Sequence, residues 1–124
     1  MNLTQAVTLV QYNTWANQRI LSKMTRLPAS SLTAETFLSH KTILGTAIHI
    51  LDTQWYWREG AQTGRLPVET LAPADFPSLP SLKRRWTEED RILLEYVQGL
   101  TAKALNDLVT YSWPRARPRS QPLW

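Results

Sequence analysis

The amino-acid sequence predicts an all-α fold in which three long helices and a short fourth element form a helical bundle. Apolar residues recur every three or four positions in residues 2–26, 42–58 and 79–98, the spacing that gives a helix one buried face. Proline, glycine and other turn residues separate these segments. Three apolar stripes close a core less well than four do, so the pattern favours a four-helix bundle.

The composition fits a single domain spanning residues 1–124. The apolar fraction of 43% is typical of a folded globule, and most of the six tryptophans should lie in the core or line a site. The sequence contains no cysteine, which excludes disulfides and thiolate metal ligands and fits a reducing cytosol. No apolar run approaches the ~18 residues of a transmembrane helix, and no signal-peptide pattern opens the chain. We therefore expect a cytoplasmic protein without a membrane partner.

The first helix should carry a polar interruption in its buried face. Thr14 and Asn17 interrupt the seam where a continuous core would be apolar, and Asn13 and Asn17, four residues apart, share a face of the helix. These amides either form satisfied buried hydrogen bonds or line a site between helices. Pro28 cannot continue the helix and should end it. The predicted apolar seam consists of Leu3, Val7, Val10, Leu21 and Met24.

The second helix carries a histidine near its middle and should close at Gly60. His49 and Asp52 are three residues apart beside the apolar face, so their side chains are neighbours. Gly45 lies one turn before His49 and leaves room there for another helix, a water molecule or an ion. His49 is then either a metal ligand or a buried histidine bonded to Asp52 or to a carbonyl. We expect His40 to be a surface or capping residue.

The third helix should follow an N-cap at Ser78. Trp86 belongs to its apolar seam, while Glu89 or Asp90 falls where the seam needs an apolar residue. A carboxylate there must be paired or reach solvent through a cleft. The connection before this helix, residues 60–78, is long enough to be a crossover or a flap.

After the third helix the sequence predicts a short helix over residues 102–108, a strand over 109–113 and a turn or hairpin over 114–122. Much of the net charge of +4 lies in this last segment, where no acid accompanies it. A basic segment can bind nucleic acid, but we expect a solvated, proline-spaced loop and no nucleic-acid partner. The arginines concerned are Arg115, Arg117 and Arg119.

The helical stripes also predict an uncovered groove where a fourth long helix would pack. Such a groove exposes several hundred Å² of apolar surface, which usually marks an interface. It could be filled by a second copy of the chain, by a partner or by a C-terminal segment that this chain lacks. We expect self-association, with a dimer as its product.

Several motifs in sequence order resemble the DinB/YfiT-like family of metal-dependent helical bundles. Residues 12–17 (Tyr-Asn-Thr-Trp-Ala-Asn) look like its first-helix signature, and residues 43–50 contain its Gly-Thr-x-x-His pattern. Asp75 and Phe76, with Leu82, Trp86 and Asp90 after them, are similar to the start of its third helix. Residues 99–101 and 109–111 match its later turns. The resemblance covers nearly all 124 residues.

This resemblance implies an antiparallel four-helix bundle and a divalent metal, zinc or nickel, held by three side chains. One ligand maps onto His49, and the other two would form a His-x-x-x-His pair on a fourth helix. The sequence has only two histidines, His40 and His49, so one copy cannot complete the site by this pattern. The resemblance thus implies a chain that is C-terminally truncated relative to the family.

For the activity, the resemblance implies a metal-dependent hydrolase or a thiol-dependent transferase or isomerase. The metal would bind a small-molecule thiol and lower its pKa. Catalytic residues remain unassigned, while Asn13, Asn17, Trp55 and Tyr56 would line the pocket. The alternative is a non-catalytic scaffold or interaction module that self-associates through the uncovered groove.

Overall fold

A computed structural model describes residues 1–112 and 117–124 and confirms the all-α class. Its helices are α1 (Leu3–Met24), α2 (Ala29–Thr33), α3 (Ile43–Thr63), α4 (Leu79–Gln98) and α5 (Ala102–Asn106), with a 3-10 turn, η1 (Pro73–Asp75). The strands β1 (Leu108–Tyr111) and β2 (Arg119–Pro122) follow. In the described part of the chain, α1, α3 and α4 are the long helices, as predicted.

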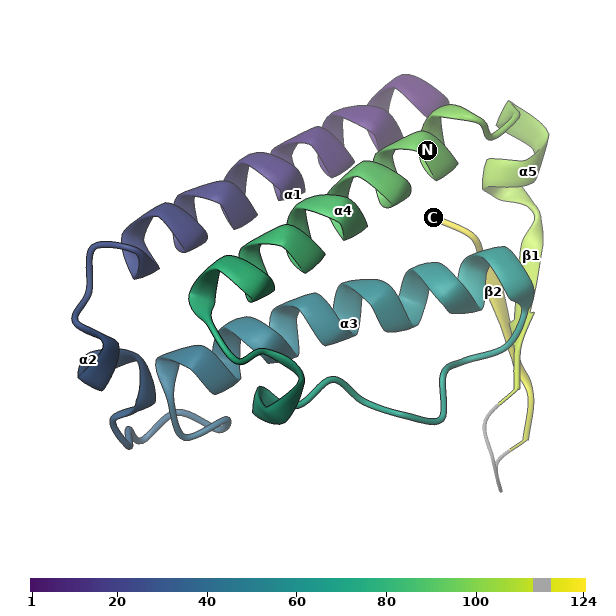
Figure 1. Cartoon of the computed structure of the whole chain (residues 1–124). Coiled ribbons are helices and arrows are strands. Elements are labelled where there is room, and N and C mark those ends of the chain that lie inside the picture. Colours follow the sequence, from purple (N-terminus) through teal and green to yellow (C-terminus); the bar gives the residue numbers. More distant parts are fainter. Residues whose placement is uncertain (113–116) are drawn as a thin grey trace.

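Helix α4 packs against both α1 and α3 and forms the centre of the bundle (Figure 1). Helix α1 runs antiparallel to the other two, because its N-terminal half packs with the C-terminal half of α4. Helices α3 and α4 run parallel, since residues 64–78 return along the bundle before α4 begins (Figure 1). The long connection is therefore a crossover, one of the two alternatives that its length predicts.

The helix ends follow local hydrogen-bonding rules. Asn2 and Gln5 form a capping box at the start of α1, and Ser78 caps α4 as predicted. Helix α1 ends at Met24, a little before the predicted boundary, and the short helix α2 begins after Pro28. The sequence did not predict α2.

The predicted end of the second helix at Gly60 is wrong. Helix α3 continues to Thr63 and is capped by Gly64, whose φ of 71° is left-handed and suits glycine. Gly60 therefore lies inside the helix, at a position where neighbouring side chains leave no room for a Cβ. A Cβ there would lie 2.6 Å from Leu66 Cδ2 and 3.1 Å from the ring of Tyr111. Gly60 thus serves packing between α3 and β1.

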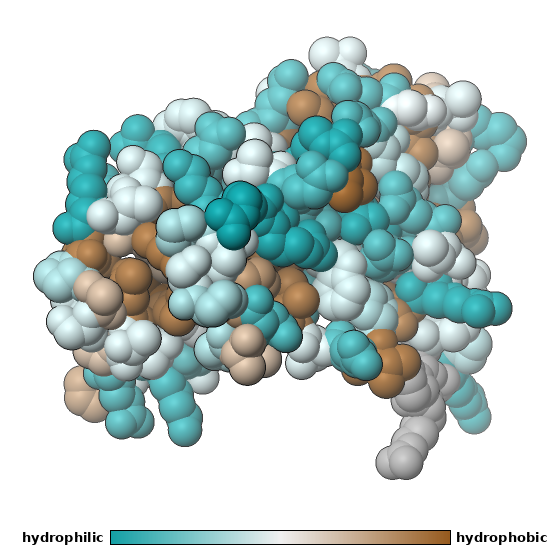
Figure 2. Space-filling model, viewed as in Figure 1, coloured by the Kyte–Doolittle hydropathy of each residue, from teal (hydrophilic) through white to brown (hydrophobic). Residues whose placement is uncertain are grey.

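Trp86 lies at the centre of the main core, where its side chain is fully buried. Leu82 and Leu51 are equally inaccessible, so α4 and α3 bury the faces that the apolar spacing predicts. By contrast, the outward side of α4 is hydrophilic (Figure 2), and Arg91 pairs there with Glu88 and Glu95. The main cluster consists of Leu21, Met24, Leu32, Ala47, Ile48, Leu51, Phe76, Leu82 and Trp86.

Strands β1 and β2 pair antiparallel, with Val109 opposite Gln121, which confirms the predicted hairpin. The predicted turn includes Arg115, which lies outside the described residues. After β2, the backbone N–H of Leu123 donates to the Asp107 carbonyl at 3.1 Å, so the chain returns to the end of α5.

No helix in the described residues is both long and apolar enough to cross a membrane.

Candidate functional site

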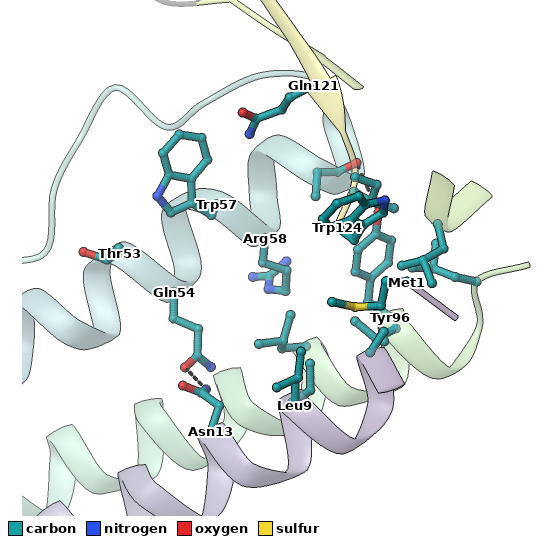
Figure 3. A pocket seen from close by; sticks show the side chains of 18 of the residues that line it. Met1, Leu9, Asn13, Thr53, Gln54, Trp57, Arg58, Tyr96, Gln121 and Trp124 are labelled. Carbon is teal, nitrogen blue, oxygen red and sulfur yellow. Dashed lines mark hydrogen bonds between the residues drawn. The ribbon is translucent and has the colours of Figure 1, made fainter. Parts of the chain in front are cut away.

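A groove of about 690 Å³ lies between α1 and α3, with α4 beneath it. Leu9 on α1 and Trp57 on α3 stand on opposite walls, and Trp124 closes one end beside Tyr96 (Figure 3). Leu9, Trp57 and Trp124 are large apolar side chains that remain 55%, 41% and 59% exposed. The groove occupies the place where a four-helix bundle has its fourth long helix.

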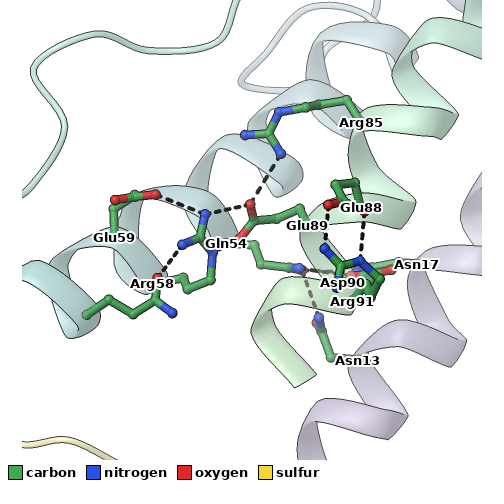
Figure 4. Close-up of polar contacts among 11 residues, drawn as sticks. Asn13, Asn17, Gln54, Arg58, Glu59, Arg85, Glu88, Glu89, Asp90 and Arg91 are labelled. Carbon is green, nitrogen blue, oxygen red and sulfur yellow. Dashed lines mark hydrogen bonds and ion pairs between the residues drawn. The ribbon is translucent and has the colours of Figure 1, made fainter. Parts of the chain in front are cut away.

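Four polar side chains form a network beneath one stretch of this groove, and they join all three long helices (Figure 4). The amides of Asn13 and Asn17 on α1 donate to Gln54 Oε1 on α3, at 2.8 and 3.0 Å. Asn17 Nδ2 and Gln54 Nε2 both donate to Asp90 Oδ1 on α4, at 2.9 Å each. Asn17 is thus a satisfied buried amide, while Asn13 also lines the groove, so each alternative holds for one residue.

Burial raises the pKa of Asp90 above its ordinary value. The hydrogen bonds from Gln54 and Asn17 oppose this effect, and the nearby charge of Glu89 adds to it. The network therefore holds a carboxyl group whose ionised form is disfavoured.

Arg58 and Glu89 form a second, charged connection between α3 and α4. Arg58 is 6% exposed and Glu89 0%, and Arg58 Nη2 donates to Glu89 Oε2 at 2.9 Å. Gln62 accepts from Arg58 Nη1 at 2.6 Å, Glu59 lies 3.0 Å from Nη2, and Arg85 donates to Glu89 at 3.2 Å. The hydrogen bond to Glu89 is the largest cause of the raised pKa of Arg58. Both acids in the seam of α4 are therefore paired, as expected.

His49 lies on the rim of the groove and is exposed. The expectation of a buried histidine bonded to Asp52 is therefore wrong, because Asp52 Oδ1 instead accepts from the Leu71 N–H at 2.7 Å. The His49 ring stacks on the His40 ring, with centroids 3.8 Å apart and planes 20° apart. The space predicted beside Gly45 is occupied by backbone: a Cβ there would lie 2.5 Å from the His40 carbonyl oxygen.

The other predicted pocket residues differ in position. Asn13 lines the groove, whereas Asn17, Trp55 and Tyr56 are not among the described residues that line it. The α3 wall passes through Ile50, Thr53 and Trp57, at spacings of three and four, so it lies on another side of the helix from Trp55. Gln54, Trp57 and Arg58 were not predicted as site residues. Gln54 and Arg58 point toward α1 and α4, a placement that becomes evident only once the helices are packed.

A three-ligand metal site needs three donor side chains converging on one point. Within the described residues, no group of three His, Asp or Glu side chains is placed to hold an ion. His49 alone of the predicted ligand set lies at the groove, so the described residues of one copy do not fit the expected site.

The fold is a bundle of α1, α3 and α4 that is open along one side. The candidate site is this opening, with His49 on its rim. A family model described as the DinB superfamily matches residues 12–122, so the chain belongs to this superfamily. No curated protein and no solved structure matched the chain in the same comparisons.

Proposed function

We propose that this DinB-superfamily protein acts as an interaction module whose groove receives a helix from a second copy of the chain. The observation that carries the proposal is the apolar groove of about 690 Å³ between α1 and α3, on a side of the bundle that no described long helix covers. Leu9, Trp57 and Trp124 leave much of their side chains in solvent there. Apolar surface gathered in this way is favourable to bury.

The chain carries an element suited to fill this groove in a partner copy. Helix α1 exposes Leu9, Tyr12 and Ile20, whose spacings of three and eight residues place them along one side of the helix. Because α1 is also one wall of the groove, a two-fold axis would bring α1 of each copy against the groove of the other. This reciprocity favours a second copy over an unrelated helix.

Charge substitutions in the groove test the proposal. We expect the wild-type chain to be a dimer at micromolar concentration by size-exclusion chromatography with light scattering. Leu9→Glu and Trp57→Glu should shift it to a monomer, because a buried carboxylate without a partner opposes association. Both variants should retain the wild-type helical circular dichroism spectrum.

Val68→Glu is the matched control, since Val68 is 84% exposed on the connection between α3 and α4 and does not line the groove. It should leave the dimer intact. At a protein concentration of about 100 µM, a dimer with a dissociation constant of about 1 µM would be nearly completely formed. A wild-type chain that stays monomeric at that concentration would therefore contradict self-association.

Metal-dependent thiol chemistry is the second candidate function, favoured by the position of His49 on the groove rim. Bound zinc or nickel would activate a small-molecule thiol as its thiolate. The two further ligands would have to come from outside the described residues of one copy. Elemental analysis of tag-free protein tests this candidate: near-stoichiometric metal that disappears in His49→Ala would support it. Metal that is unchanged in His49→Ala would contradict the role of His49.

A further inference from the structure

Helix α1 carries a row of aromatic and basic side chains on a side that faces solvent. Its members follow one another at spacings of three, four, four and three residues, which keeps them on one side of the helix over roughly 20 Å. All of them are exposed, and the last lies in the turn directly after the helix. We call this row the α1 stripe; it consists of Tyr12, Trp15, Arg19, Lys23 and Arg26.

The aromatic end of the α1 stripe is ordered although it is exposed. The Tyr12 and Trp15 rings have centroids 5.4 Å apart and planes 34° apart. The guanidinium carbon of Arg19 lies 5.1 Å from the centre of the Trp15 ring, within the range of a cation–π interaction. Tyr12 and Trp15 nevertheless remain 63% and 50% exposed. Rings that are already held in place lose little conformational freedom when a planar group packs on them.

The basic end of the α1 stripe lacks compensating charge. Residues 1–34 contain no acid, and the first acidic residue of the chain is Glu35. Among the described residues, no acid forms an ion pair with Arg19, Lys23 or Arg26. By contrast, Arg91 on α4 is paired with two glutamates. Three unpaired positive charges on one side of a helix attract a partner that carries several negative charges.

We propose that the α1 stripe binds single-stranded nucleic acid. Bases stack on the two aromatic rings, and the phosphates between and beyond them contact the three cations. Proteins that bind single strands without sequence preference combine these two features, because every base presents a flat aromatic face. A duplex keeps its base faces covered and offers the stripe only its phosphates. A lipid surface fits less well, since a helix that lies on a membrane buries an apolar face and the stripe contains no aliphatic residue.

This surface differs from those considered above. The expectation of no nucleic-acid partner rested on the basic segment that contains Arg117 and Arg119, far along the chain from α1. The groove lies along another side of α1, the one that carries Val10 and Asn13. Tyr12 also belongs to the surface proposed for self-association, so the test uses the other members of the α1 stripe.

Fluorescence anisotropy with a labelled oligothymidylate of about 15 nucleotides tests the proposal. The wild-type chain should bind it saturably in 50 mM salt, and three phosphate contacts should give log K against log salt concentration a slope of about −2. A duplex of the same length should bind at least about fivefold more weakly, because stacking is lost. A duplex that bound as tightly as the single strand would overturn the proposal.

The variants separate stacking from charge. Trp15→Ala should weaken binding at least about fivefold and leave the salt slope unchanged. Lys23→Gln should reduce the magnitude of the slope by about 0.7. Lys83→Gln is its matched control, because Lys83 is an exposed cation on α4 and its removal should leave the slope unchanged. Trp57→Glu, which alters the groove and not the stripe, should bind about as tightly as wild type.

Four results would overturn the proposal. They are a wild-type chain that does not bind the oligonucleotide at about 100 µM protein, unchanged affinity in Trp15→Ala, an equal change of slope in Lys23→Gln and Lys83→Gln, and loss of binding in Trp57→Glu, which would place the strand in the groove. Binding to phosphatidylserine vesicles without binding to the oligonucleotide would also overturn it and assign the α1 stripe to a membrane surface.

Discussion

At the scale of single residues, Trp86 fills the centre of the bundle. Its side chain is fully buried, and its indole Nε1 is a buried donor for which the described structure offers no hydrogen-bond partner. Burial of its ring outweighs this unpaired donor, because a buried aromatic side chain contributes far more than one missing hydrogen bond removes.

We predict that Trp86→Ala lowers the free energy of unfolding by roughly 3–5 kcal/mol, since it removes a large buried ring and leaves a cavity. Urea titration followed by circular dichroism measures this loss. Trp15→Ala is the control, because Trp15 is half-exposed on α1 and its truncation should cost much less. A loss below ~1 kcal/mol for Trp86→Ala would place the ring outside the core.

The glycines show what sequence can and cannot predict about a residue. Gly99 follows Gln98, the last residue of α4, and the apolar spacing alone predicts that the helix ends there. Gly45 and Gly60 are instead required by contacts with His40 and with Leu66 and Tyr111, which lie outside the helical turns that contain these glycines. A glycine that admits a neighbouring element has no local signature, which is why Gly60 was mistaken for the end of α3 when Gly64 caps it.

At the scale of elements, the Asn17–Gln54–Asp90 network connects α1, α3 and α4 at one level of the bundle. The sequence identifies Asn17 and Asp90 as breaks in two apolar seams, so their buried polar character could be predicted. It does not identify Gln54, because glutamine on a helix is usually a solvated surface residue. Gln54, which hydrogen-bonds both Asn17 and Asp90, can be recognised as their partner only once the packing of the helices is known.

Asp90 makes the stability of this network depend on pH. Because burial raises its pKa above 3.8, the folded chain binds a proton at higher pH than the unfolded chain does. Its contribution to stability therefore decreases as pH rises from 3.8 through the raised value. We predict that Asp90→Asn, which keeps an acceptor for Asn17 and Gln54, is at least as stable as wild type at pH 7. The difference in free energy of unfolding between Asp90→Asn and wild type should shrink as pH falls toward 4.

Urea titrations of both proteins across this pH range measure the effect. Glu69→Gln is the control for general charge removal, because Glu69 is exposed on the connection before α4. Its stability difference from wild type should change little with pH. An Asp90→Asn advantage that grew on acidification would contradict the predicted direction.

At the scale of the whole molecule, the fold class, the long helices and the hairpin follow from periodicity and turn residues. The parallel course of α3 and α4 does not, because residues 64–78 could have served as a flap or a crossover. The groove was predicted from the count of apolar stripes. Its lining could not be, since a rotation of α3 by half a turn would exchange Trp57 for Trp55, and packing fixes that rotation.

The order of the helices along the chain also matters while the protein is being synthesised. Helix α1 packs chiefly against α4, and the hydrogen bond from Asn17 to Asp90 spans 73 residues. At ~5–20 residues per second, a ribosome needs about 4–15 s to extend the chain from one of these residues to the other. During that time Leu21 and Met24 have no α4 to cover them. Until α4 is synthesised, the apolar seam of α1 therefore lacks the helix against which it chiefly packs.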